Sequence, residues 1–156
     1  MLRLSKLTDY AVVVLTRLGE AAPDSIETAP GIARCTGVPE PTVAKVLKAL
    51  AQSGLVAATR GARGGYRLTG RLSDITVADI IAAIDGPIAL TACVDGAAMN
   101  CEVACQCAVR GRWNLVNDAI RDALSAISLA DMRAASLPGA LRLPLVSTAD
   151  QEAHHA

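Results

Sequence analysis

The segment from Pro30 to Thr69 constrains the fold more than any other part of this chain. Two short helical patterns lie on either side of a tight turn. The first covers residues 30–35 and ends at Gly37, and the second begins at Pro41, whose missing N–H is tolerated in the first turn of a helix. Two short helices joined by a glycine-containing turn predict a helix-turn-helix.

Two strand-like runs follow the second of these helices. They cover residues 55–59 and 66–69, and the loop between them, residues 60–65, holds three glycines and two arginines. A glycine-rich loop between short strands is typical of a β-hairpin. No helix with a Lys-Ser/Thr pair follows the loop, which argues against a phosphate-binding P-loop. A helix-turn-helix followed by a basic hairpin predicts a winged helix.

The apolar residues that would form the core are mostly aliphatic, since the chain has only three aromatic residues. This composition suits packed helices better than sheets. A first helix is predicted with Ser5 as its cap, Gly19 as its stop and the apolar face Leu4, Leu7, Ala11, Val14 and Leu18. The helix that begins at Pro41 should end at Gly54 and bury Val43, Val46, Leu47 and Leu50.

Two further helices are predicted in the second half of the chain. Residues 75–84 form one, with Thr76 as its cap and Gly86-Pro87 as its end. The other, of about five turns, follows from the spacing of Trp113, Val116, Ile120, Leu124 and Ile127. We expect its long apolar face to pack against its mate in a second copy of the chain, with an intramolecular three-helix packing as the alternative.

The predicted organisation has three parts. Residues 1–72 form the winged helix, residues 73–136 carry a helix, a cysteine-rich segment and the long dimerisation helix, and residues 137–156 form a polar, loosely structured tail. The predicted fold class is therefore mainly α with a two-stranded β wing.

Charge is divided between the two halves, although the net charge is zero. Residues 1–72 carry ten Lys/Arg and five Asp/Glu, and no acidic residue occurs between Pro41 and Ser73. A basic winged helix indicates DNA binding, with a protein–protein module as the alternative. The predicted DNA contacts are, on the helix that would enter the major groove, Thr42, Lys45 and Lys48, and, on the wing, Arg60, Gly61 and Arg63.

The chain shows no sign of a membrane segment or a signal peptide. No apolar run reaches the roughly 18 to 20 residues that a membrane-spanning helix needs. The start MLRLSKLTDYAVVVL has no small-residue cleavage site, and we interpret it as mature protein. We therefore expect a cytoplasmic location, where clustered cysteines are more often metal ligands or redox groups than disulfides.

Four of the five cysteines lie in one polar stretch, CVDGAAMNCEVACQC, residues 93–107. The spacing C-x7-C-x3-C-x-C lacks the paired C-x2-C units of structural zinc sites and the C-x4-C-x2-C spacing of plant-type ferredoxins. Thiolates are soft, charged donors for iron–sulfur clusters, and polar neighbours can offer N–H groups to the sulfides. The alternative is that free cysteines are small core residues, and we adopt that interpretation for Cys35 alone.

Several motifs resemble the IscR/NsrR/RirA family of winged-helix iron–sulfur transcription regulators. They are LSKLTDYAV, GVPEPTVAKVLKAL, SGLVAATRGARGGYRL and ITVADIIAAIDG, and the resemblance runs from about Leu2 to Met132. The segments ALTACVDG, CAVRGRW and SLADM are most similar to regulators of the SUF system of iron–sulfur cluster assembly. The resemblance implies a homodimer on a palindromic double-stranded DNA operator, an iron–sulfur cluster of the [2Fe–2S] type, and no small-molecule substrate.

The resemblance also implies the cluster ligands. The family's third ligand cysteine precedes a tryptophan by six residues, as Cys107 does here, and Cys93 and Cys101 match the other two. Where the IscR branch has a ligand histidine this chain has Arg110, which has no free lone pair. The fourth ligand is then Cys105 or Asp9, which matches an aspartate that the NsrR branch uses across the dimer. We favour Asp9 because Cys105 is surplus to the family's three-cysteine pattern and lies close to Cys107. His154 and His155 lie in the tail and carry little weight.

The sequence thus predicts a cluster-sensing transcription regulator, not an enzyme, that represses genes for iron–sulfur cluster assembly. A nitric-oxide- or iron-responsive repressor of the same fold is the main alternative. A zinc-responsive repressor fits the sequence less well because the paired C-x2-C units are missing. A thiol oxidoreductase using Cys105 and Cys107 fits less well because the chain has no thioredoxin-like pattern.

Overall fold

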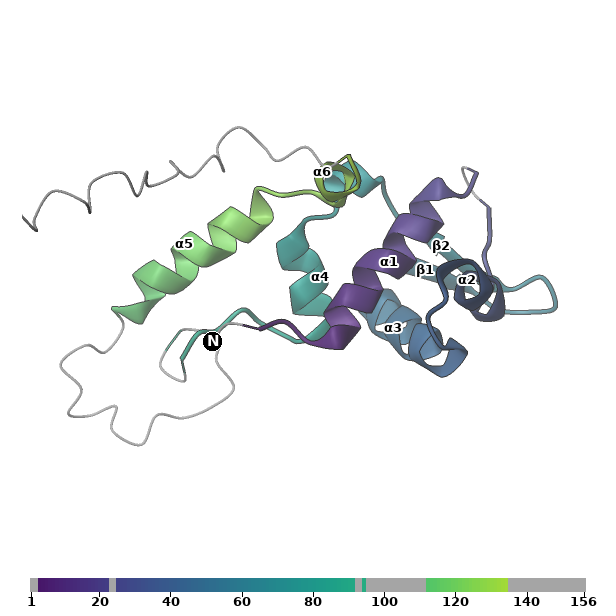
Figure 1. Cartoon of the computed structure of the whole chain (residues 1–156), viewed down its shortest axis with the longest axis horizontal. Helices are drawn as coiled ribbons and strands as arrows, with labels where there is room; N and C mark the ends of the chain where they lie inside the picture. The colour runs from purple at the N-terminus through teal and green to yellow at the C-terminus, as the bar shows by residue number, and fades with distance from the viewer. Residues whose placement is uncertain (1–2, 23–24, 92–93, 95–111, 135–156) are drawn as a thin grey trace, which may run out of the picture.

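The structure is a computed structural model that describes residues 3–22, 25–91, 94 and 112–134. The described elements are, in chain order, α1 (Lys6–Glu20), α2 (Ala29–Thr36), α3 (Glu40–Gln52), β1 (Val56–Thr59), β2 (Gly65–Leu68), the 3-10 turn η1 (Leu72–Asp74), α4 (Val77–Ile84), α5 (Trp113–Ser125) and α6 (Leu129–Arg133). Helices α2 and α3 lie with the two strands at one end, α5 lies at the other, and α1 and α4 lie between them (Figure 1). None of the described helices is both long enough and apolar enough to span a lipid bilayer.

Helices α2 and α3 confirm the predicted helix-turn-helix. The Thr28 side chain caps α2 by accepting a hydrogen bond from the N–H of Gly31, and α2 ends at Gly37, whose φ of 74° is left-handed. Pro41 lies in the first turn of α3. The four residues predicted to face the core from α3 are all buried, namely Val43, Val46, Leu47 and Leu50.

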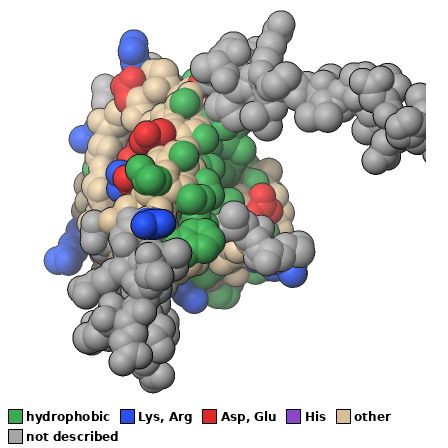
Figure 2. Space-filling view, turned by 90° about the vertical axis from the view of Figure 1, so that its left-hand side faces the viewer, with side chains coloured by type: hydrophobic (Ala, Val, Ile, Leu, Met, Phe, Trp, Pro, Cys, Tyr) green, Lys and Arg blue, Asp and Glu red, His purple; other side chains and the backbone are tan. Residues whose placement is uncertain are grey.

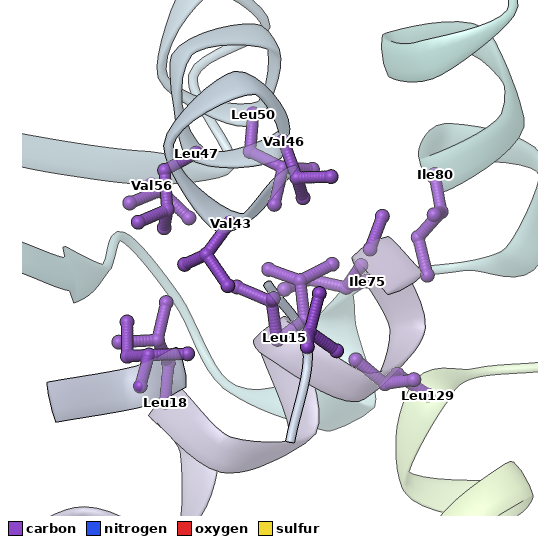
Figure 3. Packing of buried hydrophobic residues seen from close by; sticks show 14 residues of the cluster. Leu15, Leu18, Val43, Val46, Leu47, Leu50, Val56, Ile75, Ile80 and Leu129 are labelled. Carbon is purple, nitrogen blue, oxygen red and sulfur yellow. The ribbon is translucent and has the colours of Figure 1, made fainter. Parts of the chain in front are cut away.

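One aliphatic core joins the two halves of the chain. Leu15 and Leu18 of α1 meet the buried face of α3, and Ile75, Ile80 and Leu129 pack against the same cluster from the second half (Figure 3). Leu15, Ile80 and Leu129 have no exposed surface. Burial of one such side chain contributes about 1.5 to 3 kcal/mol. The winged helix and the helices that follow it therefore stabilise each other.

The two-stranded sheet confirms the predicted hairpin. In addition, Glu27 pairs with the outer side of β2, which was not predicted from the sequence. Strands β1 and β2 are antiparallel, with Val56 opposite Leu68 and Thr59 opposite Gly65. Glu27 forms a bridge with Tyr66 through N···O distances of 2.9 and 2.8 Å in the two directions. A Cβ atom at position 65 would lie 2.6 Å from the carbonyl oxygen of Glu27, so this close approach requires glycine.

Two predictions about α1 were wrong. The helix is capped by Ser5 as predicted, with the Thr8 N–H donating to Oγ at 3.3 Å, but it continues through Gly19 and ends at Glu20. Gly19 is a packing position, since a Cβ atom there would lie 2.5 Å from the Leu72 side chain. Leu4, which we expected on the buried face, precedes the helix and is 53% exposed.

The length predicted for the last long helix was also wrong. Helix α5 has 13 residues and ends at Ser125, so Ile127 lies outside it. The carbonyl of Ile127 accepts a hydrogen bond from the N–H of Val77 at 2.9 Å, and the N–H of Leu129 donates to the carbonyl of Ile75 at 2.8 Å. The chain leaves the helix because these bonds and the buried Leu129 anchor it beside the start of α4.

A capping box then begins α6. The Ser128 hydroxyl accepts from the N–H of Asp131 at 3.1 Å, and the Asp131 carboxylate accepts from the N–H of Ser128 at 2.9 Å. Hydrogen bonds from the Ser128 hydroxyl and N–H lower the pKa of Asp131. Helix α4 begins in the same way, with the predicted cap Thr76 and with Asp79.

The cysteine that lies apart from the other four, Cys35, is not a core residue. Cys35 is exposed on α2, so the interpretation of this residue as a small buried side chain was wrong. The buried face of α2 is filled by Ile32 instead, one turn earlier in the helix. The four cysteines of residues 93–107 and the predicted tail at 137–156 lie outside the described residues.

Candidate nucleic-acid interface and cluster-binding region

The surface of α3 that faces away from the core carries two cations. Lys45 and Lys48 are exposed, and Thr42 is half-buried in the first turn and a half of the helix. Because Val46 and Leu47 are buried between them, the two lysines are held on the solvent side of a helix that cannot rotate. Neither lysine forms an ion pair with a described acidic residue, so both charges are available to a polyanion.

The wing tip presents Arg60, Gly61 and Arg63, which are all exposed. The turn is closed by a hydrogen bond of 2.9 Å from the N–H of Gly64 to the carbonyl of Gly61. Gly61 has a φ of 115°, which side chains rarely adopt, so the tip depends on glycine there. The loop extends past α2 at the right of Figure 1. Two arginines are thus displayed on a short, well-defined turn.

An ion pair attaches the wing to α1. The Nη2 atom of Arg17 lies 2.9 Å from Oε1 of Glu27, and the two side chains are 29% and 21% exposed. Glu27 also pairs its backbone with Tyr66 of β2. This contact could not be predicted, because Glu27 lies in a connection with no periodic pattern. The result is that Glu27 holds the wing against α1.

Asp9, the candidate fourth cluster ligand, lies in the first turn of α1 and is exposed. Its carboxylate forms no hydrogen bond or ion pair with a described residue, so its lone pairs are free for a ligand. Asp9 borders a hollow of about 260 Å³ together with Arg3, Lys6 and the apolar side chains Val12, Val77, Ile80 and Met132.

The other candidate ligands, Cys93, Cys101, Cys105 and Cys107, belong to the segment outside the described residues. Within the described part of the chain, no three His, Cys, Asp or Glu side chains lie close enough together to hold a metal ion. Thiolates and carboxylates are donor types that can bind iron in an iron–sulfur cluster, and the carboxylate is the harder and weaker donor of the two.

Asn117 secures the chain just before the cysteine segment. It is 1% exposed, its Nδ2 donates to the carbonyl of Ile88 at 2.9 Å, and its Oδ1 accepts from the N–H of Leu90 at 3.1 Å. This role of Asn117 was not predicted from the sequence. The available signal was a polar residue at helical spacing between Trp113 and Ile120, within an otherwise apolar face.

Asp85, the C-cap residue of α4, contacts the start of α1. Its Oδ2 atom accepts a hydrogen bond from the Thr8 hydroxyl at 2.7 Å and a longer one from the Ser5 N–H at 3.4 Å. Burial raises the pKa of the Asp85 carboxyl, but these hydrogen bonds outweigh it and leave the pKa below its usual range. This contact was not predicted from the sequence either, because the partners are far apart in the chain.

One side of α5 leaves large apolar side chains in solvent. Trp113, Leu115 and Val116 are 41%, 77% and 45% exposed. Figure 2 shows hydrophobic side chains gathered in a band on the face that lies at the left of Figure 1, where α5 is. Helix α5 packs against α4 within the chain, and this contact leaves that side uncovered.

A family model described as "Rrf2: Iron-dependent Transcriptional regulator" matches residues 4–135, which include all the described helices and both strands. The chain belongs to the Rrf2 family.

The chain is also similar to individual proteins and solved structures. "Protein aau3" of Rhizobium meliloti (strain 1021) is 34% identical over 125 residues, which are 80% of this chain and 76% of that protein. The HTH-type transcriptional regulator IscR of Vibrio atlanticus (strain LGP32) is 28% identical over 131 residues, 84% of this chain and 75% of IscR. The structure of CymR, the global cysteine regulator of B. subtilis, matches with a TM-score of 0.64 and 26% identity, over 88% of this chain and 100% of CymR.

These similarities confirm three predictions from the sequence. The fold is a winged helix of the Rrf2 type, the resemblance to IscR-type regulators is real, and the protein is a DNA-binding transcription regulator and not an enzyme. The relatives include both an IscR and a CymR. Family membership therefore leaves the ligand and the signal of this Rrf2 protein to be argued from its own residues.

Proposed function

We propose that this Rrf2 protein is a homodimeric repressor that carries an iron–sulfur cluster and controls genes for iron–sulfur cluster assembly, such as the SUF genes. The observation that carries the proposal is the donor set. Four cysteines fall within fifteen residues, next to a segment that Asn117 anchors, and the exposed Asp9 carboxylate has no partner among the described residues. The family description as iron-dependent supports the same conclusion.

On DNA, α3 would occupy the major groove and the wing would reach the flanking backbone. Lys45 is the candidate for base contacts, while Thr42 and Lys48 would bind near the edges of the groove. Arg60 and Arg63 would neutralise phosphates or enter the minor groove, and Gly61 would let the backbone of the wing tip approach the DNA closely. These roles follow from the exposure of the side chains and the rigidity of the elements that carry them.

A second copy of the chain would cover the exposed apolar side of α5. Trp113, Leu115 and Val116 are large side chains whose burial would favour association by about 25 cal/mol per Å². A two-fold dimer presents two α3 helices to one face of DNA, which suits a palindromic operator with half-sites about one helical turn apart.

Cys93, Cys101 and Cys107 would hold the cluster, a [2Fe–2S] group, together with Asp9 as the fourth ligand. When bound, the cluster supplies a connection between the cysteine segment and α1 that exists only while iron and sulfide are available. Asp9 lies in the first turn of α1, and α1 packs against α3. Ligation through Asp9 would therefore act on the helix that supports the DNA-reading element. Cys105 is the alternative fourth ligand.

A nitric-oxide- or iron-responsive repressor is the second candidate function, and Asp9 is the residue that favours it, since a weakly held carboxylate is readily displaced.

The test of the proposed function is anaerobic purification with iron, sulfide and zinc measured, followed by a DNA mobility shift with and without the cluster. We expect a brown protein with matching iron and sulfide, and an operator affinity that differs between the two forms. A colourless protein that contains zinc, or none of the three, would overturn the proposal.

A further inference from the structure

Asn117 lies within the apolar face of α5, yet its side chain is polar, buried and hydrogen-bonded at both ends. It is one of two polar residues, with Thr8, that are buried among the described residues. A buried carboxamide left without hydrogen bonds costs about 1 to 3 kcal/mol. Both ends of this carboxamide are satisfied by one short stretch of backbone, the Ile88 carbonyl and the Leu90 N–H.

The bonded stretch is the entrance to the cysteine segment. Leu90 lies three residues before Cys93, and α5 begins at Trp113, six residues after Cys107. Asn117, one turn further into α5, therefore joins the two ends of the segment at its base. Bringing together the ends of a loop of n residues has an entropic cost that grows as about (3/2)RT ln n. The hydrogen bonds of Asn117 offset part of this cost before any ligand binds.

We infer that Asn117 is a positioning residue for the proposed cluster, because it binds the backbone at Ile88 and Leu90, three residues before the proposed ligand Cys93. The inference rests on the proposed function. Leucine at this position would fill a similar volume but leave the Ile88 carbonyl and the Leu90 N–H unpaired. Aspartate would still accept from Leu90, but its carboxylate would face the Ile88 carbonyl oxygen. Asn117→Leu therefore removes both hydrogen bonds, and Asn117→Asp removes one of the two.

The experiment compares Asn117→Leu and Asn117→Asp with wild type and two controls. Asp122→Asn changes an exposed residue of the same helix, and Ile32→Val weakens the core in α2, far from the cysteine segment. In the cluster-free proteins, hydrogen exchange at the Leu90 amide is measured. In the anaerobically purified proteins, the decay of the cluster absorption is followed after addition of an iron chelator.

We expect faster exchange at Leu90 in both Asn117 variants. Cluster loss should be roughly tenfold faster in Asn117→Leu, with a smaller effect in Asn117→Asp, since residues that orient metal ligands commonly change affinity by 10- to 100-fold. Asp122→Asn and Ile32→Val should match wild type in cluster lifetime, although Ile32→Val lowers the melting temperature.

The outcomes separate this inference from the proposed function. If wild type holds iron and sulfide but Asn117→Leu and Asn117→Asp lose them no faster than the controls, the inference is overturned and the proposed function stands. If wild type holds neither iron nor sulfide, the proposed function fails first and the inference falls with it. If Asn117→Leu does not fold, Asn117→Asp decides the matter by the same two measurements.

Discussion

The Asp85 carboxylate accepts a 2.7 Å hydrogen bond from the Thr8 hydroxyl, and the two residues are 77 positions apart in the sequence. This bond joins the end of α4 to the first turn of α1, one residue before Asp9. Five residues after Asp85, the N–H of Leu90 is bound by Asn117 of α5. The short stretch between α4 and the cysteine segment is thus tied to the winged helix at one end and to α5 at the other.

The first prediction concerns the stability contributed by Thr8. Thr8 is 2% exposed, so Thr8→Val keeps the shape of the side chain but leaves Asp85 without its shortest hydrogen bond. We expect the free energy of unfolding to fall by about 1 to 2 kcal/mol, measured by urea denaturation. Thr59→Val, at an exposed position of β1, is the matched control and should change little. Equal effects at the two positions would contradict a specific role for this bond.

The second prediction concerns pH. Hydrogen bonds lower the folded-state pKa of Asp85 below the usual value of 3.8, although burial alone would raise it. A carboxyl with a lowered folded pKa contributes stability above its unfolded pKa and loses that contribution as pH falls through the folded pKa. Wild type should therefore be more stable than Asp85→Asn near neutral pH. The difference should shrink as pH falls below about 4.

The measurement for Asp85 is urea denaturation of wild type and Asp85→Asn at a series of pH values. Asp118→Asn, on the exposed side of α5, serves as the control for loss of one carboxylate. A stability difference between wild type and Asp85→Asn that stays constant down to the lowest pH at which both proteins fold would show that the ionised form of Asp85 is not the stabilising one.

The third prediction concerns the wing. Arg60→Ala and Arg63→Ala should weaken DNA binding on all sequences, and the slope of log affinity against log salt should become shallower by about 0.9 per lost phosphate contact. Arg133→Ala, in α6 and paired with Glu20, removes a cation away from the wing and should leave the slope unchanged. The test is DNA binding by anisotropy at several salt concentrations. An unaltered slope in the double wing variant would remove the wing from the interface.

The fourth prediction concerns sequence recognition by α3. Lys45 is exposed on the helix that would enter the major groove, so Lys45→Ala should lose affinity for the operator and discriminate less between base changes. A specific base contact contributes about 1 to 3 kcal/mol of discrimination. Binding is measured on a set of single-base operator variants. A loss of equal size on every variant would make Lys45 a phosphate contact only.

The parts of the fold that could be predicted are those that depend on local sequence. The spacing of Val43, Val46, Leu47 and Leu50 correctly gave the buried face of α3, and Ser5 and Thr76 were correctly identified as caps. These features depend on residues within three or four positions of each other, and helical periodicity and capping chemistry act over that range.

Apart from Leu4 and Cys35, which were expected to be buried and are exposed, the errors and omissions involve distant contacts. Gly19 was mistaken for a helix stop because its real constraint is Leu72, more than fifty residues later. Ile127 continued the apolar spacing of α5, but backbone pairing with α4 ends that helix earlier. Glu27, Asp85 and Asn117 each join elements that only the folded chain brings together. For the proposed site, the cysteine donors and Asp9 came from the sequence. The structure added Asn117, which binds the chain before the cysteine segment, and Asp85, which binds Thr8 next to Asp9.

The last prediction concerns the fourth cluster ligand. Cys93, Cys101 and Cys107 should each be required for iron and sulfide to be retained, since loss of one thiolate opens an iron to water and oxygen. Asp9→Ala should shift the charge-transfer absorption and shorten the cluster lifetime, because a free, exposed carboxylate in the first turn of α1 would be lost. Glu20→Ala, at the other end of the same helix, is the matched control and should have no effect on the cluster.

The Cys105→Ser variant tests the alternative fourth ligand. If Cys105 is the fourth ligand, exchange of sulfur for oxygen should shift the absorption in this variant, and Asp9→Ala should leave the spectrum unchanged. We expect the Asp9 result, because Cys105 and Cys107 have a single residue between them, which leaves little room for the backbone to turn between two ligands. If Asp9 is a ligand, loss of the cluster would remove a contact from the first turn of α1. The hydrogen bond between Thr8 and Asp85 would then be left to hold that turn. The effect of the cluster on DNA affinity should then be smaller in Asp9→Ala than in wild type, even under conditions where both proteins retain iron.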